Sequence, residues 1–225
     1  MIYISEERKI REGRGKGTGA NYVPYVQSRD FNSLGYCSNP IDWKTGRSME
    51  MLSIGEEATW RILRWQDDVK DIREQYPLDK AETIKIADKY GINHPRDRYG
   101  LITMTTDLLV TKSSGEYEAY SVKDSRGILE NRRAVEKLFV EKVYWVSKGI
   151  SYKLVFKTDI DAQLYRNICL VVPYYKAESV HDDASVLKHL IATKQIVVDM
   201  SAPMPSMRIM VPKYKKEIDL WRRQH

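Results

Sequence analysis

An acid and a lysine stand in two strand-like segments that a short loop joins. Asp107 lies within the otherwise uncharged segment Ile102 to Val110, and Lys123 ends the segment Tyr117 to Lys123. A charge in such a segment is costly to bury unless another group compensates it. Because paired antiparallel strands bring residues near their ends side by side, the two side chains are expected to flank one point.

The chemistry that these residue types could perform is metal-dependent phosphodiester hydrolysis. An aspartate, a second acid from a neighbouring helix and a lysine can together surround one divalent ion. Carboxylate oxygens suit Mg²⁺, which takes few protein ligands and keeps several waters. The lysine can then orient the attacking water or stabilise charge on the phosphate. A plain cross-strand ion pair between Asp107 and Lys123 fits the same pattern, so the residues alone leave both interpretations open.

Other common catalytic patterns are missing from the sequence. The four histidines form no HExxH or triad-like arrangement, and there is no GxSxG motif. The glycine-rich start lacks the GK[ST] ending of a phosphate-binding loop. Cys37 and Cys169 belong to no CxxC or Cys/His cluster, which excludes a disulfide framework and a structural zinc site.

Length and charge bound the class of protein. The 225 residues, 42% of them hydrophobic, are enough for one good-sized domain, alone or with a small appendage. With 37 Lys and Arg against 31 Asp and Glu, the net charge of +6 favours a polyanionic partner such as double-stranded DNA. Neither a signal peptide nor a membrane-spanning stretch is recognisable, so we expect a cytoplasmic protein without a membrane partner.

A basic, glycine-rich segment runs from Arg8 to Gly19 and is predicted to be a flexible arm. Two interpretations are open: a solvated linker, or a segment that lies along a DNA backbone and releases counterions. In the second, the DNA-binding side chains are Arg8, Lys9, Arg11, Arg14 and Lys16.

Periodicity further along the chain predicts an α/β fold. A turn at 44–47 suggests a hairpin, and Ser53 with Glu56 has the spacing of a helix capping box. Apolar spacing and turn residues predict helices over 54–66, 79–90, 128–148 and 161–168, and strands over 69–77, 102–110, 117–123 and 152–156. Helices and strands in this order are typical of an α/β domain, which we place at residues 1–175.

The remaining residues, 176–225, are predicted to form a small helix-plus-hairpin unit. Helical spacing covers 184–194, and the apolar runs 196–200 and 207–211 could pair as strands. Arg208 to His225 carries six Lys and Arg against two acids. This end is either a contact for DNA or a protein partner, or a solvated tail.

A series of short strings resembles the TnsA family, the endonuclease subunits of heteromeric cut-and-paste transposases. They occur in the family's order between about residues 6 and 157. The strings are REGRGKG at 11–17 with Tyr22-Val23-Pro24, KTGR at 44–47, Leu52-Ser53 with Glu56, DIREQYPL at 71–78, Thr106-Asp107 and Val122-Lys123.

This resemblance implies a restriction-endonuclease-like core, a mixed sheet flanked by helices, that uses Mg²⁺ to cut the 5′ ends of a transposon. The implied partners are a DDE-type transposase, TnsB, and an ATP-dependent regulator, TnsC. Glu56 and Asp107 match the family's metal-binding acids, and Lys123 matches its catalytic lysine. For Glu56, the capping-box role remains as an alternative. The C-terminal unit resembles a reduced form of the family's winged-helix-like domain, implicated in contacts with TnsC and DNA.

Two further positions follow from the resemblance. Glu141 matches an additional acid on the family's long helix, and it lies on an apolar stripe of that predicted helix; the alternative is a rim acid paired with a lysine. Ser121 stands where the family has a glutamine, so either a water bridges the gap, or a second metal is held mainly by Asp107 and the backbone carbonyl of Val122. We expect two Mg²⁺ ions, for which Mn²⁺ can substitute.

Two other functions remain open from sequence. A catalytically inactive subunit that only bridges transposase and regulator would explain the serine at position 121. An autonomous restriction or repair nuclease would fit the core but not the family-specific strings.

Overall fold

Four strands form the main sheet of the first of two units into which the chain divides. The computed structural model describes residues 4–30 and 36–225, and the units comprise residues 1–160 and 161–225. The sheet has the order β1-β4-β5-β6, with two antiparallel pairings and a final parallel one between β5 and β6. The predicted mixed sheet is therefore confirmed. The strands are β1 (Val69–Pro77), β4 (Thr105–Lys112), β5 (Tyr117–Lys123) and β6 (Ser151–Phe156), and a small ribbon comprises β2 (Arg96–Asp97) and β3 (Gly100–Leu101).

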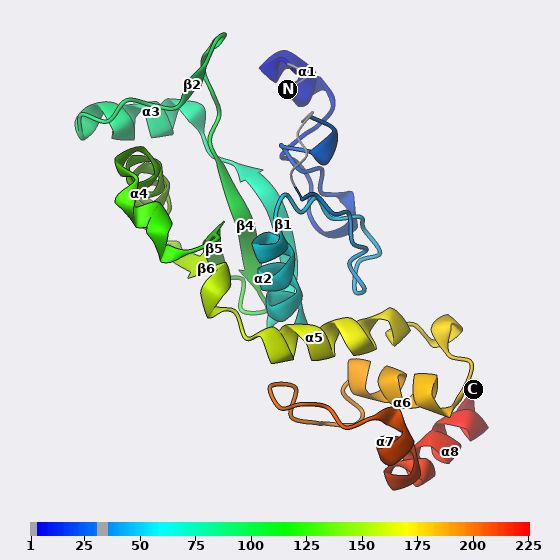
Figure 1. Cartoon of the computed structure of the whole chain (residues 1–225). Coiled ribbons are helices and arrows are strands. Elements are labelled where there is room, and N and C mark those ends of the chain that lie inside the picture. The colour runs from blue at the N-terminus through cyan, green and yellow to red at the C-terminus, as the bar shows by residue number, and fades with distance from the viewer. Residues whose placement is uncertain (1–3, 31–35) are drawn as a thin grey trace. The chain divides into compact units, whose positions relative to one another are not determined.

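Helices flank this sheet on both sides (Figure 1). Helix α2 lies against β1, β4 and β5, and the pair α3 and α4 packs over the other side, where a core cluster joins these helices to the sheet. The helical segments of the unit are α1 (Glu6–Arg11), η1 (Gly19–Asn21), η2 (Ser28–Asp30), α2 (Ile54–Trp65), α3 (Lys80–Lys89), η3 (Arg126–Glu130), α4 (Arg132–Ser147) and η4 (Lys157–Asp159). The predicted 128–148 helix is thus interrupted near residue 131, where the Asn131 side chain accepts the Ala134 N–H and begins α4 anew.

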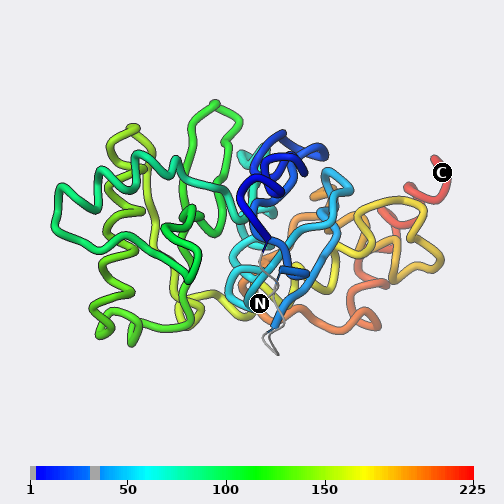
Figure 2. Tube along the Cα trace, turned by 90° about the horizontal axis from the view of Figure 1, so that it is seen from above, coloured from blue at the N-terminus to red at the C-terminus, as the bar shows by residue number. Residues whose placement is uncertain are grey.

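The segment predicted as a flexible arm is folded against the same unit, as its dark blue trace in Figure 2 shows. Gly15 N donates to the Val23 carbonyl, and Val23 N donates back to Lys16. Gly15 has a φ of +76°, and a Cβ there would lie 2.3 Å from Pro77 Cγ at the end of β1. A residue with a side chain would meet both a backbone penalty and a collision, so glycine is required for this close approach.

Strand β1 is an edge strand, and the segments before it cover that edge. The Tyr22 hydroxyl donates to the Glu74 carbonyl, and Tyr25 N donates to the Gln75 carbonyl. Arg47, in the hairpin turn, forms a bidentate pair with the buried Glu74 carboxylate, with both N···O distances at 2.7 Å. These contacts protect the edge from pairing with other chains and fix the course of β1.

The regular elements of the second unit are all helices, so the predicted helix over 184–194 is found but the predicted hairpin is wrong, and the winged-helix-like form is not confirmed. Its helices are α5 (Ala162–Val171), η5 (Val172–Tyr174), η6 (Ala177–Ser179), α6 (Asp183–Ala192), α7 (Met207–Lys213) and α8 (Lys215–Gln224). Segment 196–200 forms no strand, and 207–211 lies in α7, where Met210 is buried and Ile209 is 67% exposed. A five-residue apolar run is compatible with strand or helix, and packing decides between them.

The division between the units falls after Ile160, earlier than the predicted residue 175. Helix α5 belongs to the second unit because it packs on α6, and because Asn167 Nδ2 donates to the carbonyls of Met200 and Ala202. Across the described part of the chain, no helix combines the length and apolar character needed to cross a membrane.

Gly15→Ala is expected to destabilise the protein more than Gly13→Ala. Both glycines have positive φ, but a Cβ at Gly13 meets nothing within 4 Å whereas one at Gly15 collides with Pro77. We expect about 1 kcal/mol for the backbone strain at Gly13 and about 2–4 kcal/mol at Gly15. Urea unfolding of both variants measures this. Equal losses would show that the segment is not packed on β1.

Candidate active site

The predicted acid and lysine meet where strands β4 and β5 separate. The pairing of β4 with β5 ends where Leu108 lies opposite Tyr120. The next residue towards the start of β4 is Asp107. Its Oδ2 accepts the backbone N–H of Val122 at 2.6 Å, in place of a strand partner. The Ser121 hydroxyl donates to the same oxygen at 3.4 Å. Where the pairing ends, the Asp107 carboxylate therefore lies beside Ser121 and Val122 of β5.

Lys123 completes this arrangement. Its Nζ donates to Asp107 Oδ2 at 2.9 Å and to the Val122 carbonyl at 2.8 Å. Burial alone would lower the pKa of Lys123, but Asp107 and the neighbouring glutamates outweigh it and raise the pKa, so the side chain is an ammonium. The cross-strand ion pair and the candidate site are thus one and the same arrangement.

Glu56 reaches the site from the first turn of α2. A close approach of helix and sheet makes this possible, because a Cβ on Gly55 would lie 3.2 Å from Val122 Cγ1. Glu56 also acts as a capping residue: its carboxylate accepts from Leu52 N and from the Ser53 hydroxyl, and its own N–H donates to Ser53 Oγ. Burial and the Asp107 charge raise the pKa of Glu56 to about 7. The predicted capping contacts are therefore confirmed, and the same carboxylate lies within the electrostatic influence of Asp107.

Glu141 enters from α4 and is buried. Its two oxygens accept from the hydroxyls of Thr106, at 2.8 Å, and Tyr152, at 3.2 Å. Trp145 Nε1 in turn donates to Thr106 Oγ1 and fixes that hydroxyl. Burial and the Asp107 charge raise the pKa of Glu141 to about 7. A rim acid paired with a lysine does not describe this residue, which the structure holds inside the fold by neutral donors.

Gln75 is a polar residue of the site that the sequence analysis did not single out. It is buried, and its Nε2 donates to Glu56 Oε2 at 3.1 Å. Its φ of +48° is unusual for a residue other than glycine. The one available signal is its place inside the DIREQYPL string, which shows a family likeness but gives no role.

The donor chemistry around Asp107 fits a divalent cation such as Mg²⁺. Three carboxylates act on one ammonium, and the pKa values of Glu56 and Glu141 are raised to about 7 by burial and by repulsion from the Asp107 charge. A cation would relieve that repulsion. In residues 4–30 and 36–225, no three His, Cys, Asp or Glu side chains form a metal-binding cluster by themselves. An ion here would need the Val122 carbonyl, Ser121 or waters as well, and Mg²⁺ accepts such a mixed oxygen set.

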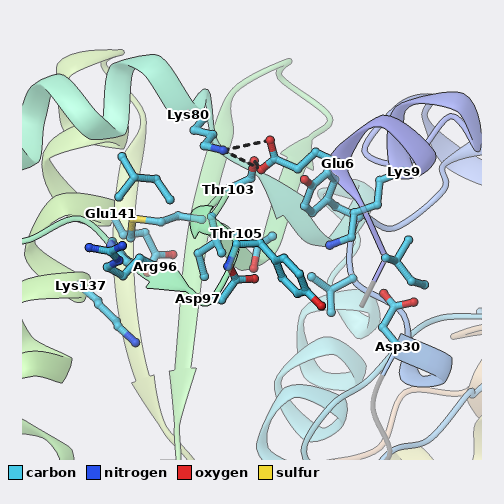
Figure 3. A pocket seen from close by; sticks show the side chains of 18 of the residues that line it. Glu6, Lys9, Asp30, Lys80, Arg96, Asp97, Thr103, Thr105, Lys137 and Glu141 are labelled. Atoms are coloured by element: carbon cyan, nitrogen blue, oxygen red, sulfur yellow. Dashed lines mark hydrogen bonds and ion pairs between the residues drawn. The ribbon is translucent and has the colours of Figure 1, made fainter. Parts of the chain in front are cut away.

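A pocket of about 920 Å³ opens beside these residues (Figure 3). Lys123 and Glu141 lie in its wall, which continues along α4 and the β2–β4 region to the N-terminal segment. Glu6 is held at one end by Lys80 and by the Thr103 hydroxyl. Because this wall includes the candidate catalytic lysine, a ligand in the pocket would lie against the reactive groups.

The five basic side chains predicted to contact DNA have different surroundings. Arg14 is buried, and its guanidinium forms ion pairs with Glu12 and Asp30. It is therefore not exposed for contact with DNA. Lys9 lines the pocket and stacks its ammonium over Tyr25, 4.3 Å from the ring centre. Of the others, Arg8 pairs with Glu12, and Arg8, Arg11 and Lys16 are exposed.

The raised pKa values of Glu56 and Glu141 predict that the metal-free protein loses stability as pH rises. Between pH 4.5 and about 7 the folded state keeps protons that the unfolded chain has released. Glu141→Gln removes one of these groups. Between pH 4.5 and about 7, the free energy of unfolding of this variant should therefore fall by on the order of 1–3 kcal/mol less than that of the parent. Urea unfolding in EDTA at several pH values measures the slope, with the exposed Glu130→Gln as control. Identical slopes for Glu141→Gln and the parent would contradict the assignment.

Comparison with known proteins agrees with this geometry. Residues 66–157, which contain Gln75, Asp107, Lys123 and Glu141, match the family described as TnsA-like endonuclease N terminal. The chain is also similar to the Transposon Tn7 transposition protein TnsA of Escherichia coli, with 36% identity over 162 residues. That match covers 72% of this chain and 59% of the relative, so the chain spans well under the relative's whole length. Residues 66–157 therefore form a domain of the TnsA-like endonuclease N-terminal type, and the similarity to TnsA extends over most of the chain.

Proposed function

We propose that the protein is a Mg²⁺-dependent DNA endonuclease that cuts the 5′ ends of a transposon during cut-and-paste transposition. The observation that carries this proposal is the meeting of Glu56, Asp107 and Lys123 at one point, where β4 and β5 separate. The three residues come from separate segments of the chain, and each was expected at this point from the sequence. An ion pair needed only for stability would not require two further buried acids beside it.

The residues that would hold Mg²⁺ are Glu56, Asp107, the Val122 carbonyl and, through water, Ser121. When bound, the ion supplies positive charge that activates water and neutralises the phosphate. Asp107 and the Val122 carbonyl accept two of the three protons of the Lys123 ammonium, which leaves the third for an incoming phosphate or water. In the reaction a water oxygen bonds to phosphorus, and the bond from phosphorus to the leaving sugar oxygen breaks. The role of Glu141 is to add negative charge beside Lys123 and so keep it protonated.

We further propose that the pocket beside the site accepts the DNA strand that is cut. Several charges in its wall are already compensated, since Lys80 pairs with Glu6, and Asp30 with Arg14. Arg96 and Lys137 are exposed side chains of the wall, placed to meet phosphates. Together with Lys9, they would continue the positive charge of Lys123 along the strand. Arg8, Arg11 and Lys16 would extend these contacts outside the pocket.

The proposed partners are a TnsB-type DDE transposase, which cuts the other strand, and a TnsC-type ATP-dependent regulator. We assign their contacts to the second unit, which exposes Ile209 and Leu220. Part of its basic charge is internally paired, because Lys215 and Arg222 both bond to Asp183. Apolar protein contacts therefore suit this unit better than DNA contacts made by charge alone.

Asp107→Ala and Lys123→Ala are each expected to lower 5′-strand cleavage by at least about 10²–10³-fold, because each removes a group that meets the phosphate or its ion. The measurement is strand-specific cleavage of a labelled transposon-end duplex with both partners, in Mg²⁺ and in EDTA. Asp88→Ala and Lys85→Ala, on the exposed face of α3, are the matched controls. Cleavage at the parent rate in either site variant would refute the proposed chemistry.

Two other outcomes of this assay would redirect the assignment. Partner binding without any cut by the parent chain would make it a structural subunit that bridges transposase and regulator. A cut by the isolated chain, with neither partner present, would make it an autonomous nuclease.

Arg96→Ala and Lys137→Ala are expected to weaken binding to duplexes of any sequence, because they neutralise phosphates. Each should reduce the slope of log affinity against log salt by about one. Fluorescence anisotropy in EDTA, where no cut occurs, measures this for a labelled duplex. Lys142→Ala lies on the same helix as Lys137 but outside the pocket, so it should leave the slope unchanged. An equally large reduction of this slope in Lys142→Ala would show that DNA binds outside the pocket.

A further inference from the structure

Gln75 joins the helix and the sheet that together build the candidate site. Its neighbours in β1 pair regularly, Glu74 with Leu108 and Tyr76 with Thr106, so Gln75 lies between these pairs at the level of Asp107. Its side chain bonds to Glu56 of α2 rather than to a residue of its own strand. The amide therefore connects the two elements that carry the site's acids.

The orientation of this amide is fixed by a second hydrogen bond. The Thr105 hydroxyl donates to Gln75 Oε1 at 3.3 Å, so the oxygen faces Thr105 and the NH₂ group faces Glu56. The reverse orientation would set the amide oxygen against a carboxylate oxygen, with no donor from Gln75 to Glu56. Gln75 is thus presented to Glu56 as a hydrogen-bond donor.

The backbone at Gln75 is held in a conformation that its residue type disfavours. Among the described residues other than glycine, only Gln75 and Lys194 have positive φ, at 48° and 58°. Glycine or asparagine would adopt this conformation at lower cost. Tyr25 N, which donates to the Gln75 carbonyl, and the paired residues on either side maintain it. Strain of this kind in a buried polar residue beside an active site points to a use for the side chain.

Glu56 has two other donors, and both belong to the start of its own helix. Leu52 N and the Ser53 hydroxyl hold the carboxylate as a capping group, whether or not a sheet lies next to it. Of the three donors, Gln75 is the one that comes from the sheet. It alone of these three fixes the carboxylate relative to the strand that pairs with the Asp107 segment.

We propose that Gln75 is a positioning residue of the nuclease, whose amide holds the Glu56 carboxylate towards Asp107 for metal binding and cleavage. This inference rests on the proposed function. It adds that the site depends on an amide from β1 as well as on its acids and lysine. A residue that orients a metal ligand in this way is expected to affect metal affinity and turnover by about 10–100-fold.

The test compares three variants with the parent protein. Gln75→Gly removes the amide but suits the left-handed backbone, so it should fold with thermal stability close to the parent's. Gln75→Asn also tolerates that backbone and keeps an amide on a shorter side chain. Lys194→Gly relieves similar backbone strain in the second unit and is the matched control.

Two quantities are measured for each variant. One is Mn²⁺ binding without DNA, followed by the loss of the free-ion electron paramagnetic resonance signal. The other is the rate of 5′-strand cleavage with both partners at saturating DNA. We expect Gln75→Gly to lose about 10–100-fold in Mn²⁺ affinity and in rate, Gln75→Asn to lose less, and Lys194→Gly to match the parent. The KM for DNA should change little, because Gln75 touches an acid and no phosphate.

Binding and cleavage by Gln75→Gly within about twofold of the parent would overturn the inference, as would equal losses in Lys194→Gly. Asp107→Ala in the same series distinguishes a failure of the nuclease assignment from a failure of the proposed role of Gln75. If Asp107→Ala is inactive while Gln75→Gly behaves as the parent, the nuclease assignment stands and the role of Gln75 fails. If the parent neither binds Mn²⁺ nor cuts, the proposed function and this inference fail together.

Discussion

The site depends on an excess of buried negative charge around one ammonium group. Glu56 and Glu141 each interact with Asp107 and with Lys123, and burial limits the screening of the repulsion by water. Without a cation, two of these acids keep their protons up to about pH 7, and hydroxyl and N–H donors surround the carboxylates. The arrangement is costly for an isolated domain and useful to an enzyme that recruits a divalent ion.

Much of the first unit serves to hold that unfavourable cluster together. Gly55 allows α2 to approach β5, which brings Glu56 to Asp107. The separation of β4 from β5 leaves Val122 N for the Asp107 carboxylate to satisfy. Trp145 fixes the Thr106 hydroxyl that supports Glu141. Packing elsewhere in the core offsets the destabilising effect of these buried charges.

The strings that resemble the TnsA family have two different physical roles. Thr106-Asp107 and Val122-Lys123 lie in the candidate site. In contrast, the glycine-rich segment, the KTGR turn and DIREQYPL contact one another along the edge of β1, through the Gly15–Pro77 approach and the Arg47–Glu74 ion pair. A basic string near the N-terminus can therefore be a structural element: the buried Arg14 neutralises Glu12 and Asp30, whereas Lys9 is left to face the pocket.

The sequence by itself determined the elements of the α/β core and the acid and lysine at their ends, because periodicity, capping residues and turns are local signals. Strand β1 was predicted at its observed bounds, 69–77, and α2 within one residue. Three features were decided only by tertiary structure. Met207 to Val211 became helical because packing buries Met210 and leaves Ile209 exposed. Arg14 turned inward because Asp30, distant in sequence, lies beside it. Gln75 joined the site because the fold places its strained backbone opposite Asp107, and no local pattern records a contact between residues so far apart.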